Sequence, residues 1–213
     1  MVQMILKKFP SGPIETNAYL FACSKTKIAA VIDPSSGSAA SILEKAQELD
    51  LNIKKILLTH SHWDHIADAH LLVQKTGAEI YVHPLDAANL EHPGSDKLPL
   101  FFPIHGVKPD HFIQEGERVF VGEIACEVIH TPGHSPGCVC FYLREEKILF
   151  SGDTLFEGSI GNLSLATAQP ARMWASLEKL AVLPPDTRVM PGHGSDTTIG
   201  KEHWLKRARE IFE

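Results

Sequence analysis

Residues 56–65 read I-L-L-T-H-S-H-W-D-H, an apolar run followed at once by four side chains able to bind a metal ion. Side chains in an extended chain repeat every two residues, so His60 and His62 are expected on one side, where they can share an ion. Asp64 and His65 follow where the strand is expected to give way to a turn, and they can face a second ion. These ligands suit Zn²⁺, Fe²⁺ or Mn²⁺, and the lack of a nearby cysteine argues against a thiolate site.

Length and composition indicate an ordinary globular chain. It has 213 residues, 44% of them hydrophobic and 22% charged, which is enough for one sizeable core. We therefore expect one domain over residues 1–213. The formal charge of -6 argues against a primary nucleic-acid or anionic-membrane surface. No apolar stretch approaches the roughly 18 residues of a membrane span, and without a recognisable signal peptide the expected location is the cytoplasm.

The four cysteines, at 23, 126, 138 and 140, form no C-x-x-C motif. Cys138 and Cys140 are two residues apart in an expected strand, so they share one of its faces. We interpret them as reduced packing residues, because such a pair is poorly placed for a disulfide or a metal site.

The first half of the chain alternates between strand-like and helix-like patterns. Short apolar runs at 2–9, 17–23 and 28–33 predict an antiparallel meander. A helix capped by Ser36 or Ser38, a strand at 53–58, a helix at about 66–76 stopped by Gly77, and a strand at 79–82 are expected next. This alternation predicts a parallel βαβ arrangement.

The second half predicts more strands, at about 118–121, 124–130, 138–143, 147–151 and 187–190. A helix is expected from Pro170 until Pro184-Pro185, and Thr198 is expected to cap a final helix. Residues 91–116 show little periodicity, and loops of that length inside compact proteins are usually functional. Phe101 and Phe102 in this segment either belong to a lid or only seal the edge of the core.

Three further potential ligands share one kind of placement. His134 in T-P-G-H-S-P-G, Asp153 in S-G-D-T-L-F and His193 in P-G-H-G each lie in a glycine-containing turn just after an apolar, strand-like run. Strand ends are rigid, and glycines allow the backbone to approach an ion closely. We therefore expect these turns to converge with residues 60–65 on one site that binds two ions.

The four motifs, H-S-H-W-D-H, T-P-G-H-S-P-G, G-D-T-L-F and P-G-H-G in this order, resemble those of the metallo-β-lactamase superfamily over essentially the whole chain. The resemblance implies an α/β fold, a four-layer αββα sandwich of two mixed β-sheets flanked by helices, with the site at one edge between the sheets. It also implies two divalent ions, with zinc as the default and iron or manganese as alternatives. The implied ligands are His60, His62 and His134 for the first ion, Asp64, His65 and His193 for the second, and Asp153 bridging both.

Within the family, the motifs look like those of glyoxalase II and of short, single-domain hydrolases related to it. This implies hydrolysis of small-molecule thioesters such as S-lactoylglutathione. Two cations about 3.5 to 4 Å apart lower the pKa of a bridging water to about 7, so the resulting hydroxide is the expected nucleophile. Asp64 is expected to orient it, and Asp153 to hold both ions. A thiolate, with a pKa near 8.5, leaves without protonation, which favours thioesters over amides or phosphodiesters.

Departures from the family pattern leave alternatives open. Asn162 stands where relatives often have a basic residue, and a C-terminal glutathione-binding region is not recognisable, so weak binding of glutathione is expected. The main alternative is a persulfide dioxygenase that holds a single iron through His60, His134 and Asp153. A phosphodiesterase or lactonase of the same fold is a further alternative.

Seven histidines match none of the motifs, and surface or hydrogen-bonded core positions are expected for them. They are His70, His83, His92, His105, His111, His130 and His203. His83 and His130 border strands near the expected site, so a role as hydrogen-bond partners of a metal ligand stays open for these two.

Overall fold

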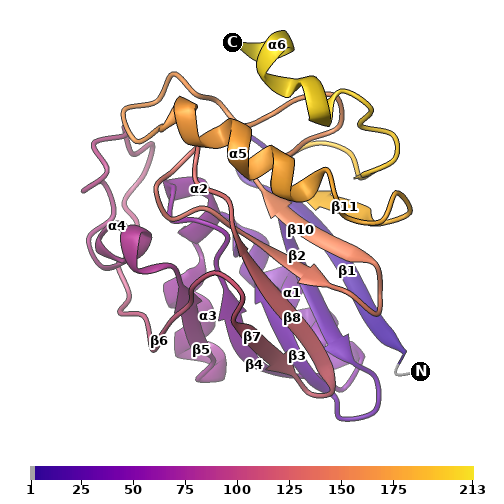
Figure 1. Ribbon diagram of the computed structural model, residues 1–213. Coiled ribbons are helices and arrows are strands. Elements are labelled where there is room, and N and C mark those ends of the chain that lie inside the picture. The colour runs from indigo at the N-terminus through magenta and orange to yellow at the C-terminus, as the bar shows by residue number, and fades with distance from the viewer. Residues whose placement is uncertain (1–2) are drawn as a thin grey trace.

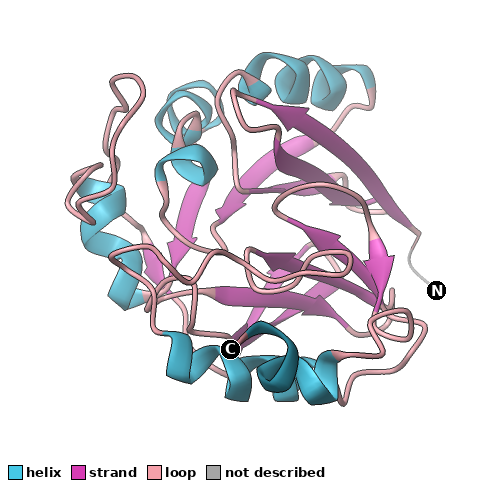
Figure 2. Cartoon of the chain, turned by 90° about the horizontal axis from the view of Figure 1, so that it is seen from above, coloured by secondary structure: helices cyan, strands magenta, loops and turns pink. Residues whose placement is uncertain are grey.

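The computed structural model describes residues 3–213 and contains two six-stranded sheets, stacked face to face between layers of helices. Figure 1 shows the arrangement of the elements, and the view from above in Figure 2 shows helices outside both sheets. Both sheets mix parallel and antiparallel pairs. The predicted αββα sandwich is therefore confirmed.

The first sheet has the strands in chain order. They are β1 (Met4–Ser11), β2 (Thr16–Cys23), β3 (Ile28–Ile32), β4 (Asn52–Leu57), β5 (Glu79–Val82) and β6 (His111–Phe112). Pairs β1–β2 and β2–β3 are antiparallel, whereas β3–β4, β4–β5 and β5–β6 are parallel. The predicted meander and the predicted parallel βαβ stretch are both confirmed. Helices α1 (Ser38–Glu48) and α3 (Ala69–Thr76) connect the parallel strands.

The second sheet has the order β12-β11-β10-β9-β8-β7. Its strands are β7 (Arg118–Val121), β8 (Ile124–His130), β9 (Val139–Leu143), β10 (Ile148–Gly152), β11 (Arg188–Pro191) and β12 (Thr197–Thr198). Only the β10–β11 pair is parallel, and helix α5 (Pro170–Leu180) forms the crossover between these two strands. The remaining elements are α2 (Trp63–Ile66), η1 (Pro84–Asp86), α4 (Ala87–Glu91), η2 (Leu205–Arg207) and α6 (Ala208–Phe212).

Alternation along the strands builds three buried layers. In β2, Leu20 packs with residues of α1 and α3, while Tyr19 and Phe21 face the second sheet. In β9, Phe141 faces the first sheet and Tyr142 packs with residues of α5. Because each sheet is covered on both faces, its central strands are buried along their length, as in other layered α/β folds.

Helix α1 begins at Ser38, but its predicted serine caps are wrong, and the helix start predicted at Thr198 is wrong as well. The residue that caps α1 is Gly37, at φ 81°, and no serine side chain makes a capping hydrogen bond there. Thr198, expected to cap the last helix, instead pairs with Arg188 in the short edge strand β12. The 3₁₀ helix η2 begins only at Leu205. The Thr198 hydroxyl does accept from the Lys201 amide at 3.3 Å, but no helix starts there.

The helix predicted at about 66–76 is divided in two. Helix α2 already begins at Trp63, and α3 follows from Ala69 until Gly77, whose φ of 65° ends the helix as predicted. Asp68 lies at the break, where its amide donates to the Pro34 carbonyl at 2.9 Å. The break thus ties the start of α3 to the segment that precedes α1.

The four cysteines are free and buried, as predicted. No helix within residues 3–213 combines the length and the apolar character needed to cross a membrane.

Candidate metal centre

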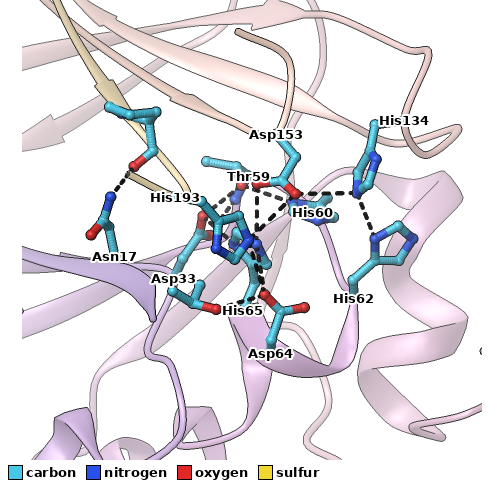
Figure 3. Close-up of polar contacts among 12 residues, drawn as sticks. Asn17, Asp33, Thr59, His60, His62, Asp64, His65, His134, Asp153 and His193 are labelled. Carbon is cyan, nitrogen blue, oxygen red and sulfur yellow. Dashed lines mark hydrogen bonds and ion pairs between the residues drawn. The ribbon is translucent and has the colours of Figure 1, made fainter. Parts of the chain in front are cut away.

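The seven residues expected at the site lie together at one edge between the two sheets, as Figure 3 shows. Each comes from a segment that follows a strand. His60 and His62 follow β4, Asp64 and His65 belong to α2, His134 follows β8, Asp153 follows β10, and His193 follows β11. The segments that follow these strands therefore converge on one site, as predicted.

The backbone changes from extended to helical within residues 60–65. His62 is extended, with φ -60° and ψ 148°, and it is the residue from which α2 starts. The His65 amide donates to the His62 carbonyl at 3.0 Å, which closes the first helical turn. The expected turn at Asp64 and His65 is thus a helical one, and it directs these two side chains away from His62.

A first group of potential ligands consists of three imidazoles. Ring nitrogens of His60, His62 and His134 all lie within 4.8 Å of one another. His62 Nδ1 lies 2.8 Å from His134 Nε2, and the rings of His60 and His62 have their centres 4.7 Å apart. The other ring nitrogens point outward to the surrounding protein, as described below.

A second group combines a carboxylate with two imidazoles. Oδ2 of Asp64 lies 3.2 Å from His65 Nε2 and 3.3 Å from His193 Nε2. The hydroxyl of Thr16 donates to the same Asp64 oxygen at 2.7 Å. This bond holds the carboxylate against the two rings.

Asp153 lies between the two groups (Figure 3). Its Oδ2 is 3.4 Å from His134 Nε2 in the first group and 3.6 Å from His193 Nε2 in the second. Its Oδ1 is 3.3 Å from His65 Nε2. The carboxylate therefore faces both groups, as a bridging ligand must.

The donor atoms fit divalent cations. His60 Nε2, His65 Nε2 and Asp153 Oδ1 are buried and have no hydrogen-bond partner among the described residues. Leaving a buried polar atom unpaired costs about 1–3 kcal/mol. Bound cations would give these three atoms the partners that the protein itself does not supply. Tetrahedral ligands at about 2.0–2.1 Å from an ion lie about 3.3 Å apart. The separations of 3.2 to 3.6 Å around Asp64 and Asp153 match that value.

Each imidazole is oriented through its other nitrogen. The partners are Thr59 Oγ1 for His60 at 3.0 Å, Thr167 Oγ1 for His62 at 3.0 Å, Asp33 Oδ2 for His65 at 2.9 Å, Asn162 O for His134 at 3.0 Å and Ile14 O for His193 at 3.2 Å. Metal-binding histidines normally have such partners, which fix the tautomer and the direction of the ring. None of these five hydrogen-bond partners was predicted from the sequence.

His83 and His130, the two histidines left open as partners, do not fill this role. Their rings stack on each other, with centres 4.1 Å apart. His83 Nδ1 accepts from the Leu85 amide, and His130 Nε2 faces the Pro136 carbonyl. Neither ring is hydrogen-bonded to a residue of the two groups.

Asp33 could be taken for a ligand, because it lies near His60 and His65. Its oxygens are occupied, however, by the Thr59 amide at 2.8 Å, the Thr59 hydroxyl at 2.6 Å and His65 Nδ1 at 2.9 Å. We therefore interpret Asp33 as a residue that positions His65. It follows strand β3 directly, and this placement after an apolar run was the available sequence signal.

Asp86 joins the two segments that carry the first group. Its buried carboxylate accepts from the Ser61 amide at 2.9 Å, the Ser135 hydroxyl at 2.9 Å and the Gly137 amide at 2.7 Å. Ser61 lies between His60 and His62, and Ser135 follows His134. A Cβ atom on residue 137 would lie 2.4 Å from Asp86 Oδ1, so glycine is required there.

The charges suit cation binding. Burial, helped by neighbouring imidazoles, lowers the pKa of His60 far below its usual value, and burial together with His134 lowers the pKa of His62 to about 3. Burial raises the pKa of Asp64 and Asp153, but the charge of His65 outweighs it, so the pKa of Asp153 falls to about 2. Despite burial, the charges of Asp64 and Asp153 raise the pKa of His65, and a hydrogen bond to Asp64 raises the pKa of His193. The carboxylates are thus in the form that binds metals, whereas the rings of His65 and His193 must lose a proton when a metal binds.

The segment predicted as a lid lies over this centre. Leu98, Pro99 and Phe101 line a cavity that also reaches His62, Asp64 and His193. Phe102 instead packs its ring edge against Trp63, with ring centres 5.6 Å apart. Phe101 therefore does more than seal the core, while movement of residues 91–116 stays a prediction.

Comparison with known proteins identifies the family. Residues 11–193 match the model of the metallo-beta-lactamase superfamily. A hydroxyacylglutathione hydrolase, GloC of Haemophilus influenzae (strain ATCC 51907 / DSM 11121 / KW20 / Rd), is 39% identical over 180 residues, which cover 83% of this chain and 84% of GloC.

Two solved structures are also similar. The B3 metallo-beta-lactamase BLEG-1 is 37% identical with a TM-score of 0.86, covering 95% of this chain and 100% of that one. TTHA1623, in a di-iron-bound form, is 38% identical with a TM-score of 0.78, covering 92% of this chain and 96% of that one. With its fold and its two clusters of histidine and aspartate, the chain belongs to the metallo-β-lactamase superfamily of metal-dependent hydrolases.

Proposed function

We propose that this protein is a glyoxalase II-like hydrolase that cleaves small-molecule thioesters with two bound divalent metal ions. The observation that carries the proposal is the position of Asp153 between two complete ligand groups, with three buried donor atoms left unpaired. The similarity to GloC supports a thioester substrate.

The proposed ligands follow the two groups. His60, His62 and His134 would hold one ion, Asp64, His65 and His193 would hold the other, and Asp153 would contribute to both sites. Zinc is our default assignment. These ligands also serve iron and manganese, and the similarity to the di-iron form of TTHA1623 makes iron a serious candidate.

When bound, a pair of such ions supplies a hydroxide at neutral pH and stabilises negative charge on the attacked carbonyl oxygen. Asp64, held by the Thr16 hydroxyl, is proposed to orient the nucleophile through its remaining oxygen. The chain's own thiols are poor candidates for a nucleophile. All four are buried, and burial raises the pKa of Cys126, Cys138 and Cys140.

Hydrolysis of β-lactams is the second candidate, because the match to BLEG-1 covers 95% of this chain and the whole of BLEG-1. Both reactions need an activated water and a stabilised carbonyl oxygen, but they differ in the leaving group. A thiolate departs unprotonated, whereas the β-lactam nitrogen needs a proton.

The test combines metal analysis with a substrate panel. Purified protein is analysed for bound metal and then assayed with S-lactoylglutathione, a coenzyme A thioester, a β-lactam, a lactone, a phosphodiester, and glutathione persulfide with oxygen uptake recorded. We expect two ions per chain and preferential thioester cleavage. One tightly bound iron, with oxygen uptake and no thioester cleavage, would instead identify a persulfide dioxygenase.

A further inference from the structure

A cavity of about 330 Å³ opens directly beside the proposed metal centre. Five proposed metal ligands are among its lining residues, namely His62, Asp64, His134, Asp153 and His193. The rest of its lining is mainly apolar and includes Ile14, Trp63, Leu98, Pro99, Phe101 and Leu165. A group attached to a carbonyl at the metal centre would therefore extend into apolar surroundings.

Two aromatic side chains, Trp63 and Phe101, belong to the apolar lining of this cavity. The rings of Trp63 and Phe101 have their centres 5.0 Å apart and meet at 46°. Phe101 is 70% exposed and Ile14 is 49% exposed, although both are large apolar residues. Apolar surface gathered beside a cavity, rather than scattered over the molecule, is typical of a binding site.

The segment carrying Leu98 to Phe101 is held at both ends by α4. Asn89 in that helix donates to Asp96 at 2.9 Å, and the same Asp96 accepts from the Leu98 amide at 3.0 Å. After the segment, the Val107 amide donates to the Leu90 carbonyl at 3.1 Å. These bonds keep Phe101 at the cavity rim.

The described lining of the cavity offers neither lysine nor arginine to a charged substrate. Among the described residues that line the cavity, Asn162 is the one polar residue outside the proposed ligands. The side-chain oxygen of Asn162 already accepts from the Ser164 amide at 2.8 Å. A carboxylate placed against the apolar lining of this cavity would lose its water without gaining a lysine or an arginine as a partner.

The neighbouring cavity, of about 200 Å³, lies on the other side of His62 and does not change this conclusion. Two aspartates, Asp86 and Asp96, help to line it, and again no lysine or arginine is among the described lining residues. The two carboxylates of a glutathionyl group would thus find no protein cation in either cavity.

We propose that the apolar cavity binds an uncharged apolar group adjoining the thioester carbonyl, so that aliphatic or aromatic thioesters are preferred to glutathione thioesters. Phe101 is the main specificity-determining residue, because its exposed ring has the largest apolar area to bury on such a group. This inference rests on the proposed thioesterase function and names its substrate class. The apolar group is either the acyl part or the thiol part.

Two series of thioesters test the inference and separate these two parts. One series has acetyl, butanoyl and hexanoyl groups on the uncharged thiol N-acetylcysteamine, and the other has acetyl thioesters of ethyl, butyl and hexyl thiols. Burial of one methylene is worth about fourfold in kcat/KM, so about fifteenfold is expected for each pair of methylenes in the series that enters the cavity. The hexyl or hexanoyl compound should also exceed S-lactoylglutathione.

The variant Phe101→Ala should reduce the ratio of kcat/KM between the longest and shortest member of the responding series by about tenfold. The matched control is Phe120→Ala, which removes a phenylalanine that is 56% exposed on β7, outside the cavity, and should leave the ratio unchanged. Calorimetry with ketone analogues, in which a methylene replaces the sulfur, should show the same loss in binding.

The outcomes distinguish this inference from the function on which it rests. If no thioester is hydrolysed by the metal-loaded protein, the proposed function fails. If thioesters are hydrolysed but neither series responds to chain length, or Phe101→Ala leaves the ratio intact, the apolar site is wrong and the thioesterase function stands.

Discussion

Asp33 Oδ2 lies 2.9 Å from Nδ1 of His65, and both side chains are buried. The two residues are 32 positions apart, so only the packing of β3 against β4 brings them together. This contact leaves His65 Nε2 facing Asp64 and Asp153. Asp33 thus selects which nitrogen of His65 is available to a metal.

We predict that Asp33→Asn weakens metal binding by about 10- to 100-fold, the usual effect of removing a partner of a ligating histidine. Chelator competition with the metal-loaded protein measures it. Asp110→Asn is the control, because Asp110 accepts a backbone amide from Ile80 in the first sheet, away from the centre. Equal affinities in the two variants would contradict the positioning role of Asp33.

Asp153→Ala should abolish most thioester hydrolysis. Two cations would then face each other without the carboxylate between them, so we expect a loss larger than the 10- to 100-fold typical of partner residues. Turnover and metal content are measured together. His83→Ala, which alters a histidine without a hydrogen bond to the site, should keep near-normal turnover. Full metal content with near-normal hydrolysis in Asp153→Ala would exclude a bridging role.

Asp86→Ala should destabilise the fold as well as the site. The amides of Ser61 and Gly137 would lose a buried acceptor, and each unpaired group costs about 1–3 kcal/mol, so we expect a loss of at least about 2 kcal/mol in urea unfolding. Asp68→Ala, which removes the acceptor of the Ala39 amide, should cost less. A smaller effect for Asp86→Ala than for this control would argue against Asp86 as the link between the two segments.

His83 should make stability depend on pH. Burial and the neighbouring His130 lower its pKa from 6.5 to about 4 in the folded chain. The unfolded chain therefore takes up a proton first as the pH falls from 6.5 to 4, so His83 destabilises the fold progressively in this window and has no such effect above it. Urea unfolding at several pH values should show a weaker dependence for His83→Gln than for the parent. His203→Gln, at an exposed histidine, should behave like the parent.

Much of the fold follows from local pattern. The alternation in β2 and β9 assigns each side chain to one of three buried layers, and this two-residue period can be read without knowing the partner strands. Capping signals were less reliable. Thr198 pairs with Arg188 in an edge strand, and although its hydroxyl accepts from the Lys201 amide, no helix starts there.

The sequence by itself determined which residues are the candidate ligands, because His60, His62, Asp64 and His65 lie within six residues and the other three candidates lie in recognisable turns. Only the tertiary structure decided how these side chains are held. Asp33, Asp86 and Thr16 act through hydrogen bonds to residues at least 25 positions away. The apolar lining of the cavity likewise depends on the tertiary structure, because Phe101 and Trp63 come from separate segments and pack against each other. A ligand's identity is local, whereas its orientation depends on contacts that exist only after the sheets have packed.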